Sequence, residues 1–360
     1  MAIYPVCWLL QLGLLIASVT CFVQPDGKPD SSQHVLHVDG AYPQIVTGLR
    51  DPAHIVVHDA SGKVSWNWTN ADFVNQTIPD ELKSCLKKGG SLTDAKWANN
   101  GGSILSIYAN AVVMINHYPE DKSKDKNITF GMCLDTHDLG GTHGIELVPD
   151  GKLAIATTSP SENGTIKVVN VSLGTTSPYP DYLQELDGLP AVHNLVWDQT
   201  ANSLWADGNF STAPSKVHII GPPKTLDDEW PDSTPWWDGG HDITPVPNKR
   251  QLLITSDLDL HLFDISSETF QNGTEVLKGP WFKGFEPVSS HKDQLPRADI
   301  KSSSLHESGG TLYVQADWKD YYSKQVNYLS PGSKVSNITF PQNLYRSRWF
   351  SAVPGWDAAS

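Results

Sequence analysis

Residues 142–156, THGIELVPDGKLAIA, form the stretch that decides the fold of this 360-residue chain. Polar residues at its start lead into an apolar run that ends near Leu147. A turn follows at Asp150-Gly151, and a second apolar run covers residues 153–156. Two short apolar runs joined by such a turn predict a pair of β-strands. The same pattern of two apolar runs joined by a turn recurs elsewhere in the chain, which indicates a repeated unit.

Six segments share this pattern. Positions 94, 143, 193, 241, 301 and 348 mark corresponding points, and the steps between them are 49, 50, 48, 60 and 47 residues. Four short strands in a unit of about 40 to 50 residues are typical of a β-propeller blade. The first and second runs of each unit are 93–97 with 104–107, 142–147 with 153–156, 192–197 with 204–205, 240–244 with 252–254, 299–301 with 312–314, and 348–350 alone. Third runs lie at 111–115, 166–169, 217–220 and 260–263, and edge strands are expected at 128–132 and 338–340.

The two ends of the chain complement each other. The last unit has only its first strand, and the N-terminal part offers three strands at 44–47, 54–58 and 64–68. Pairing the C-terminal strand with these N-terminal strands closes the ring and removes an exposed sheet edge. We therefore expect an all-β chain that forms a single β-propeller of six blades. A seventh blade within residues 69–92 or 280–298 is the alternative, and the only expected helix is a turn at 79–87.

Composition limits the classes of partner. The chain contains 28 Gly and 25 Pro residues, a composition that suits a fold with many turns. The formal net charge is −14, with 26 Lys and Arg against 40 Asp and Glu. Such a surface repels phosphate backbones, so nucleic acid is excluded as a leading partner. We expect a monomer that takes a small-molecule or oligosaccharide substrate.

Residues 1–23 contain no charged side chain. Their apolar stretch ends in small residues, which predicts a secretory signal peptide cleaved between about residues 18 and 23. A membrane anchor is the alternative, but it needs about 20 apolar residues and Gln11 and Gly13 interrupt this run. Residues 24–360 are then one extracellular propeller domain with no membrane attachment.

Asparagine sequons and cysteines agree with secretion. Cys7 and Cys21 fall in or beside the signal, which leaves Cys85 and Cys133 either as a disulfide or as two buried thiols. Asn-x-Ser/Thr sites predict N-glycosylation on solvent-facing loops. The eight sites are Asn67, Asn75, Asn127, Asn163, Asn170, Asn209, Asn272 and Asn337.

The first strand of a blade lines the central channel, and all six residues at the repeat positions are ionisable. If these six positions served only for packing, we would expect Leu, Val or Ile there, so we predict a functional pocket at the axis. The alternative is that these groups hydrogen-bond one another or channel water and hold the blades together without turnover. The six candidate catalytic residues are Asp94, His143, His193, His241, Lys301 and Arg348.

Two chemistries fit these six positions. The imidazoles of His143, His193 and His241 could hold one divalent metal, Mn, Ca or Zn, and leave positions open for substrate. Alternatively, one neutral imidazole acts as a general base. Lys301 and Arg348 would then neutralise a substrate carboxylate.

Other polar and aromatic residues are assigned less specific roles. Trp236 and Trp237 precede a strand that enters the channel, so we predict that they bind substrate together with Lys96. The tryptophans within first strands are expected to pack between blades. Asp257 and Asp259 alternate with leucines, which predicts a solvated strand face. The chain contains no Gly-x-Ser-x-Gly nucleophile elbow and no glycine-rich phosphate loop.

Several short motifs resemble a family of secreted β-propeller proteins of bacteria and fungi. The motifs are Asp94-Ala95-Lys96, Val148-Pro149-Asp150-Gly151 after His143, Val196-Trp197-Asp198 after His193, and Gly239-Gly240-His241-Asp242. This resemblance covers most of residues 44–316 and implies a propeller fold. The histidine-lined axis is also similar, in residue types only, to oligogalacturonate lyases, in which histidines hold a metal beside a cationic carboxylate clamp. Fold analogy alone assigns no activity.

Three functions follow as expectations. The first is a secreted carbohydrate-active enzyme, a lyase that acts on a uronate-containing glycan by proton abstraction at an axial histidine or metal site. The second is a secondary-metabolite cyclase or a lactonase-type propeller enzyme with the same pocket. The third is a propeller that binds a glycan or a protein without turnover.

Overall fold

The computed structural model describes residues 42–88, 91–135, 137–158, 164–189, 191–208, 217–220, 239–257, 259–271, 276, 281–285, 298–316, 321–331 and 335–356. The chain divides into residues 1–32 and 33–360, and every described residue belongs to the second unit. The predicted signal peptide, Trp236, Trp237 and the sequons at 163, 209 and 272 lie outside the described residues. Within the described part, no helix has both the length and the apolar character needed to cross a membrane.

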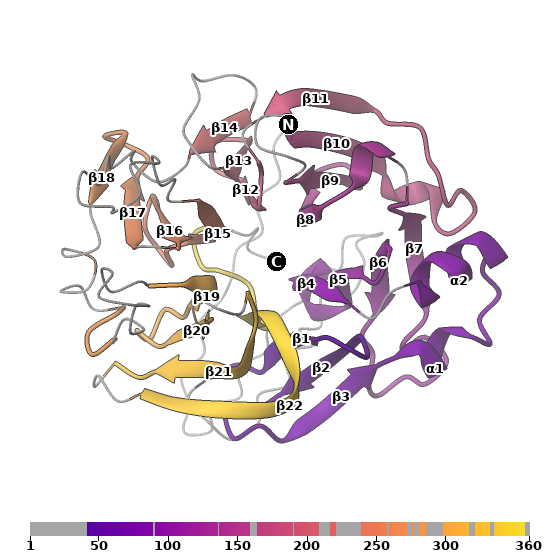
Figure 1. The fold of residues 1–360 in the computed structure, drawn as a ribbon, viewed down its shortest axis with the longest axis horizontal. Helices are drawn as coiled ribbons and strands as arrows, with labels where there is room; N and C mark the ends of the chain where they lie inside the picture. The colour runs from indigo at the N-terminus through magenta and orange to yellow at the C-terminus, as the bar shows by residue number, and fades with distance from the viewer. Residues whose placement is uncertain are drawn as a thin grey trace, which may run out of the picture. The chain divides into compact units, whose positions relative to one another are not determined.

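Nearly all the regular structure is β-strand, arranged as sheets of consecutive strands (Figure 1). Each sheet follows the chain from one strand to its neighbour, as the repeated runs in the sequence predict. Three of these sheets have four strands and one has three. Their strands are β4(Leu92–Ala98), β5(Ser103–Tyr108), β6(Ala111–Asn116) and β7(Ile128–Cys133); β8(Thr142–Val148), β9(Lys152–Thr157), β10(Gly164–Asn170) and β11(Gln184–Leu189); β12(Asn194–Asp198), β13(Ser203–Asp207) and β14(Val217–Ile220); and β15(Gly240–Pro245), β16(Gln251–Ser256), β17(Leu260–Asp264) and β18(Thr269–Gln271).

A fifth sheet joins the two ends of the described chain in the order β19-β20-β21-β22-β1-β2-β3. The long strand β22 serves two neighbours: its first part pairs with β21, and its last part pairs with β1 through Ile45 opposite Trp349 and Val46 opposite Arg348. The C-terminal strand therefore pairs with the N-terminal strands. The strands of this sheet are β19(Ile300–Leu305), β20(Thr311–Gln315), β21(Ser323–Leu329), β22(Val335–Trp349), β1(Ile45–Leu49), β2(His54–His58) and β3(Val64–Trp68).

The innermost strands follow one another around a common centre. β4 contacts β8, β8 contacts β12, and the succession continues through β15, β19 and β22 back to β4. Figure 1 shows the sheets radiating from this centre. Apolar residues of neighbouring sheets fill the space between them, as where Leu105 and Ile107 pack with Leu153 and Ile155. The fold is an all-β propeller, which confirms the predicted fold class.

Residues 69–92, one of the two segments in which a seventh blade is the alternative, contain two helices followed by the start of β4. α2(Asp80–Lys87) occupies the predicted helical turn, and α1(Asn70–Phe73) was not predicted. Thr69 and Asp72 form a reciprocal capping box that stabilises the first turn of α1. Within 280–298, residues 281–284 form turns. The count of six blades stays a prediction. Short 3₁₀ helices lie at Asn99–Gly101, His137–Leu139 and Val171–Leu173.

Four of the described sequon asparagines are exposed, which is the accessibility that glycosylation requires. The fifth, Asn170, is half-buried, and its side chain accepts a hydrogen bond from the backbone N–H of Ser172. The exposed asparagines are Asn67, Asn75, Asn127 and Asn337.

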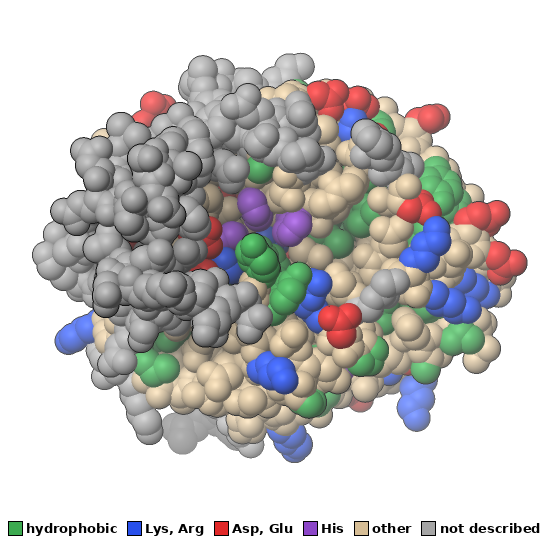
Figure 2. All heavy atoms as spheres, in the orientation of Figure 1, with side chains coloured by type: hydrophobic (Ala, Val, Ile, Leu, Met, Phe, Trp, Pro, Cys, Tyr) green, Lys and Arg blue, Asp and Glu red, His purple; other side chains and the backbone are tan. Residues whose placement is uncertain are grey.

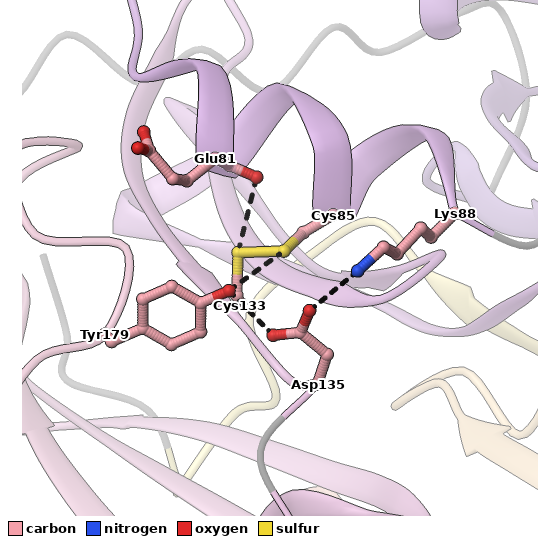
Figure 3. The surroundings of a disulfide bond; sticks show 6 residues. All are labelled: Glu81, Cys85, Lys88, Cys133, Asp135 and Tyr179. Atoms are coloured by element: carbon pink, nitrogen blue, oxygen red, sulfur yellow. Dashed lines mark hydrogen bonds and ion pairs between the residues drawn. A yellow bond between two sulfur atoms is a disulfide. The ribbon is translucent and has the colours of Figure 1, made fainter.

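A disulfide between Cys85 and Cys133 ties α2 to β7 (Figure 3). The two Cα atoms are 5.6 Å apart and 48 residues apart in the sequence. Beside the bridge, Asp135 accepts hydrogen bonds from Lys88 Nζ at 2.9 Å and from the Tyr179 hydroxyl at 2.8 Å. The bridge fixes α2, which forms no part of the sheets, against the strands β6 and β7 that it contacts.

Replacing Cys85 and Cys133 together with alanine should lower the free energy of unfolding by about 4 kcal/mol, because the open chain regains the entropy of a loop of this length. Urea unfolding of the double variant and of the wild type under oxidising conditions measures the difference. Under reducing conditions the two proteins should become nearly equal. An undiminished difference after reduction would assign the loss to packing of the sulfur atoms instead.

Candidate functional site

Three axial histidines converge on one buried guanidinium. The Arg346 side chain donates through Nη1 to the backbone carbonyl of His143 at 2.6 Å, and through Nη2 to those of His193 at 2.8 Å and His241 at 3.0 Å. These histidines lie at the starts of β8, β12 and β15, so one side chain joins three blades. The structure therefore brings the backbone of three of the six repeat positions together around Arg346.

Arg346 was missed because the repeat register marks position 348. Side chains of a strand alternate between faces, so residues 346 and 348 point to the same side of β22 and both reach the axis. The period-2 pattern of Arg346, Arg348 within the last strand was the signal that could have found it. Its side chain is fully buried and also donates to Asp94 Oδ2 at 3.0 Å.

Asp94 and Asp242 hold both arginines in an ion-pair network. Arg348 donates through Nε to Asp94 at 3.2 Å and through Nη2 to Asp242 at 3.0 Å. Asp242 also accepts from the Asn194 side chain at 2.6 Å and from the backbone N–H of Ser303 at 2.9 Å. This network ties β4, β12, β15, β19 and β22 together across the axis. Arg348 is therefore a structural tie between blades in this arrangement.

The charges of this network shift the pKa of its members. Burial alone would raise the pKa of Asp94, but the positive charges of Arg348 and Arg346 outweigh it and lower that pKa to about 2. Burial would lower the pKa of Arg348, whereas Asp242 and Asp94 raise it. Both groups remain charged at any ordinary pH.

His143 and His193 share one local geometry. Nδ1 of His143 lies 2.8 Å from the carbonyl of Gly141, and Nδ1 of His193 lies 3.0 Å from that of Ala191. A carbonyl only accepts, so each neutral ring carries its proton on Nδ1 and keeps a lone pair on Nε2. The ring centroids are 5.3 Å apart. Gly144 permits this approach, because a Cβ there would lie 2.9 Å from the Cα of Asn194.

Both imidazoles are held neutral. Burial lowers the pKa of His143 to about 4, and the nearby charges of Arg346 and Arg50 act in the same direction. Burial also lowers the pKa of His193 well below its usual value, helped by His241, His143 and Arg346. Rings in this state are available as proton acceptors or as ligands at neutral pH.

His241 takes a different position. Its Nε2 lies 2.7 Å from Asp257 Oδ1 and 2.8 Å from Lys301 Nζ, and Lys301 is also paired with Asp257 at 2.8 Å and Asp299 at 2.9 Å. Burial would raise the pKa of Asp257, but His241 and Lys301 lower it below the usual range. Burial would lower the pKa of Lys301, but Asp257 and then Tyr345 raise it.

The prediction that Asp257 lies on a solvated strand face is wrong. β16 ends at Ser256 and β17 begins at Leu260, so Asp257 belongs to the connection between strands and not to an alternating face. From there its carboxylate turns towards His241 and Lys301. A period of two in the sequence predicts a face only while the strand continues.

The three histidines do not fit one ion in this arrangement. Among the described residues, the group of three potential ligand atoms that lies within 4.8 Å of one another is Cys85, Cys133 and Asp135. Those cysteines are joined in the disulfide and offer no thiolate. Nε2 of His241 is engaged by Asp257 and Lys301, which leaves His143 and His193 as the imidazoles with available lone pairs on Nε2.

A buried phenol completes the surroundings of the histidines. The ring centroid of Tyr345 lies 6.0 Å from that of His143 and 6.0 Å from that of Tyr322. The guanidinium of Arg50 lies over the Tyr322 ring, 4.0 Å from its centroid. Burial raises the pKa of Tyr345, so its hydroxyl keeps its proton. Figure 2 shows histidine side chains in a hollow near the centre of the visible face, with acidic and basic side chains beside them.

Lys96 is not brought together with the histidines. It lies near the other end of β4, where its Nζ pairs with Glu146 at 2.9 Å, and both residues line a cavity with Trp97 and Trp197. The structure therefore brings His143, His193, His241 and Lys301 together in one group. Asp94 and Arg348 belong to the adjoining ion-pair network with Asp242 and Arg346.

Comparisons with known proteins identify no family for this chain. No family model matches this chain, and no curated protein matches it. Among solved structures, the C-terminal WD40 domain of Sif2 is 14% identical over 84% of this chain and 67% of that chain, with a TM-score of 0.40. Apo AztD from Citrobacter koseri is 12% identical over 85% of this chain and 96% of that chain, with a TM-score of 0.41. The fold assignment above accordingly depends on the strand pairings.

Proposed function

We propose that the chain is a secreted carbohydrate-active lyase that cleaves a uronate-containing glycan at the axial histidines. The observation that carries this proposal is the pair of half-buried, neutral imidazoles of His143 and His193, each fixed through Nδ1 and each with a lone pair on Nε2. A fixed, unprotonated base is what proton abstraction from a carbon acid requires.

The reaction would be a β-elimination. Nε2 of His193 or His143 takes the proton α to the substrate carboxylate, and the electrons of that C–H bond form a C=C bond as the adjacent glycosidic C–O bond breaks. The leaving oxygen takes a proton from the Tyr345 hydroxyl, which its raised pKa keeps protonated. No oxidant or reductant is needed, and the base returns its proton to the phenolate through solvent.

Charge around the histidines favours an anionic substrate. The charge of Arg346 is paired with Asp94, so the charge of Arg50, which also lowers the pKa of His143, is the one that would attract a carboxylate. A bound carboxylate would in turn raise the pKa of the neighbouring imidazole and make it a stronger base. Direct clamping by Arg348 is disfavoured, because its N–H groups donate to Asp94, Asp242 and Ser303.

A divalent metal, Mn, Ca or Zn, is the alternative source of positive charge, with His143 and His193 as its imidazole ligands. The non-enzymatic alternative has its own support, because Asp94, Arg346 and Arg348 do connect the blades. A cyclase or lactonase-type activity would use the same hollow with a less acidic substrate.

The test is a panel of polygalacturonate, alginate, heparan sulfate and neutral glycans, monitored for the ultraviolet absorbance of an unsaturated uronate. We expect product from at least one uronate polymer and none from the neutral glycans. Treatment with a chelator, followed by elemental analysis, separates a metal-free base from a metal-assisted one. Binding of a uronate polymer without product over long incubation would replace the lyase with the binding function.

A further inference from the structure

A second cavity lies away from the histidines and is lined by tryptophans. It has a volume of about 310 Å³ and adjoins a smaller one of about 110 Å³. The two share Lys96, Trp97, Glu146, Trp197 and Trp356, and neither is lined by an axial histidine. The larger volume is near the lower limit for ligand pockets, which suits a small ligand.

This cavity opens at the other end of the inner strands. His193 directly precedes β12, whereas Trp197 lies near its end, and four extended residues span roughly 13 Å. Arg348 lines the smaller cavity while its guanidinium joins the network with Asp94 and Asp242. The ion-pair network therefore separates the histidines from the tryptophan cavity.

The aromatic walls are held in place. Trp356 is buried, and its Nε1 donates to the carbonyls of Val246 at 2.9 Å and Lys249 at 3.0 Å. Trp97 and Trp197 are half-buried, so part of each ring faces the cavity they line. Trp97 and Trp197 also pack against the apolar clusters beside them, as predicted for tryptophans within first strands.

Polar groups in the cavity carry balanced charge. Lys96 Nζ lies 2.9 Å from the Glu146 carboxylate and donates to the carbonyl of Leu195 at 2.9 Å. The side chain of Lys96 is 11% exposed and that of Glu146 is 22% exposed. Within the described residues, the indole Nε1 atoms of Trp197 and Trp349 are buried without a hydrogen-bond partner. Buried donors of this kind normally find an acceptor. A ligand with hydroxyl oxygens would supply one, and the neutral ion pair disfavours a charged ligand.

We propose that this cavity binds a neutral sugar ring, as a monosaccharide or as one unit of a short oligosaccharide. The apolar C–H face of the ring would stack on an indole, its hydroxyls would accept from Trp197 and Trp349, and others would contact the Lys96–Glu146 pair. The site is independent of the proposed lyase chemistry, since it lies beyond the ion-pair network. It adds a neutral-glycan binding function to the other end of the propeller.

The test is calorimetric titration of the full chain with maltose, cellobiose, lactose and methyl mannoside, with glucuronate as the acidic comparison. We expect one of the neutral sugars to bind. Trp197→Phe, which keeps a ring but removes the N–H, should weaken binding by about fivefold, the loss of one hydrogen bond. Lys96→Met should also weaken it.

His193→Ala is the matched control at the opposite end and should leave the sugar affinity unchanged. A fold-retaining check by urea unfolding accompanies each variant. The proposal is overturned if no neutral sugar binds, if glucuronate binds more tightly than all of them, or if Trp197→Phe and Lys96→Met bind like the wild type. Loss of lyase activity in His193→Ala with intact sugar binding would separate the two sites.

Discussion

Arg346→Met should lower the free energy of unfolding by about 3 to 5 kcal/mol, the usual loss when one partner of a buried ion pair is removed. Methionine fills similar volume but supplies no donor, so three backbone carbonyls and one oxygen of Asp94 lose their partner. Urea unfolding at neutral pH measures the change. Arg346→Lys, which keeps the charge with fewer donors, should fall between the variant and the wild type.

Lys152→Met is the control for this prediction. Lys152 pairs with Asp150 at 3.3 Å, but their side chains are 42% and 81% exposed, so its loss should change stability by less than about 1 kcal/mol. If Arg346→Met is no less stable than Lys152→Met, the axial network does not hold the blades together.

The ion-pair network of Asp94 should also make the stability of the protein depend on pH in the acidic range. The pKa of Asp94 is lowered from 3.8 to about 2 by folding, so its contribution to stability is present above pH 3.8 and is lost as the pH falls towards 2. Without Arg346 that pKa should rise towards 3.8, and the loss of stability that Asp94 contributes on acidification should become smaller. Unfolding midpoints of both proteins between neutral and acidic pH show whether it does.

His193→Ala should reduce formation of the unsaturated product by about 10²- to 10⁴-fold if His193 is the base, with His143→Ala as the matching variant for the other candidate. Removal of the base slows proton abstraction without disturbing the arginine network, because Arg346 contacts only the backbone carbonyls of the two histidines. Initial rates on the uronate polymer that the wild type cleaves provide the measurement. His54→Ala, which changes a histidine of β2, should retain wild-type rates.

The pH profile gives an independent readout. The pKa of His143 is lowered from 6.5 to about 4, and that of His193 is also lowered, so both bases stay neutral well below pH 6.5. The acid limb of kcat/KM for the free enzyme should therefore lie below 6.5, near 4 if His143 is the base. An acid limb at or above 6.5, or undiminished rates in both alanine variants, would contradict the assignment.

Linkage adds a constraint on these experiments. A histidine with a lowered pKa binds its proton more readily in the unfolded chain, so the folded state loses stability as the pH falls from 6.5 towards 4. Rates in that range have to be compared with the folded fraction at each pH. A loss of rate without unfolding then reports the base.

Local patterns predicted most of the strands, although not β11, β18 or β21. β2 and β3 lie at 54–58 and 64–68 as the apolar runs predicted, because strand side chains alternate and the runs end at turn residues. The edge strands β11 and β18 were missed, since QELDGL and TFQ are largely exposed and carry no apolar run. Edge strands form through backbone hydrogen bonds to a neighbour, which the sequence does not display.

The sequence by itself determined the repeat and the corresponding positions of the inner strands, since a regular spacing of inner strands places such positions at one end of a propeller; it did not indicate Arg346. Only the tertiary structure decided how those residues are used. Arg346 enters from the same strand face as Arg348, and Asp257 arrives from a connection between strands. These residues pair their charges with Asp94, Asp242 and Lys301, while burial holds the imidazoles of His143 and His193 neutral. The physical reason is that charge pairing in a buried channel depends on distances between different blades, and those distances exist only once the ring is assembled.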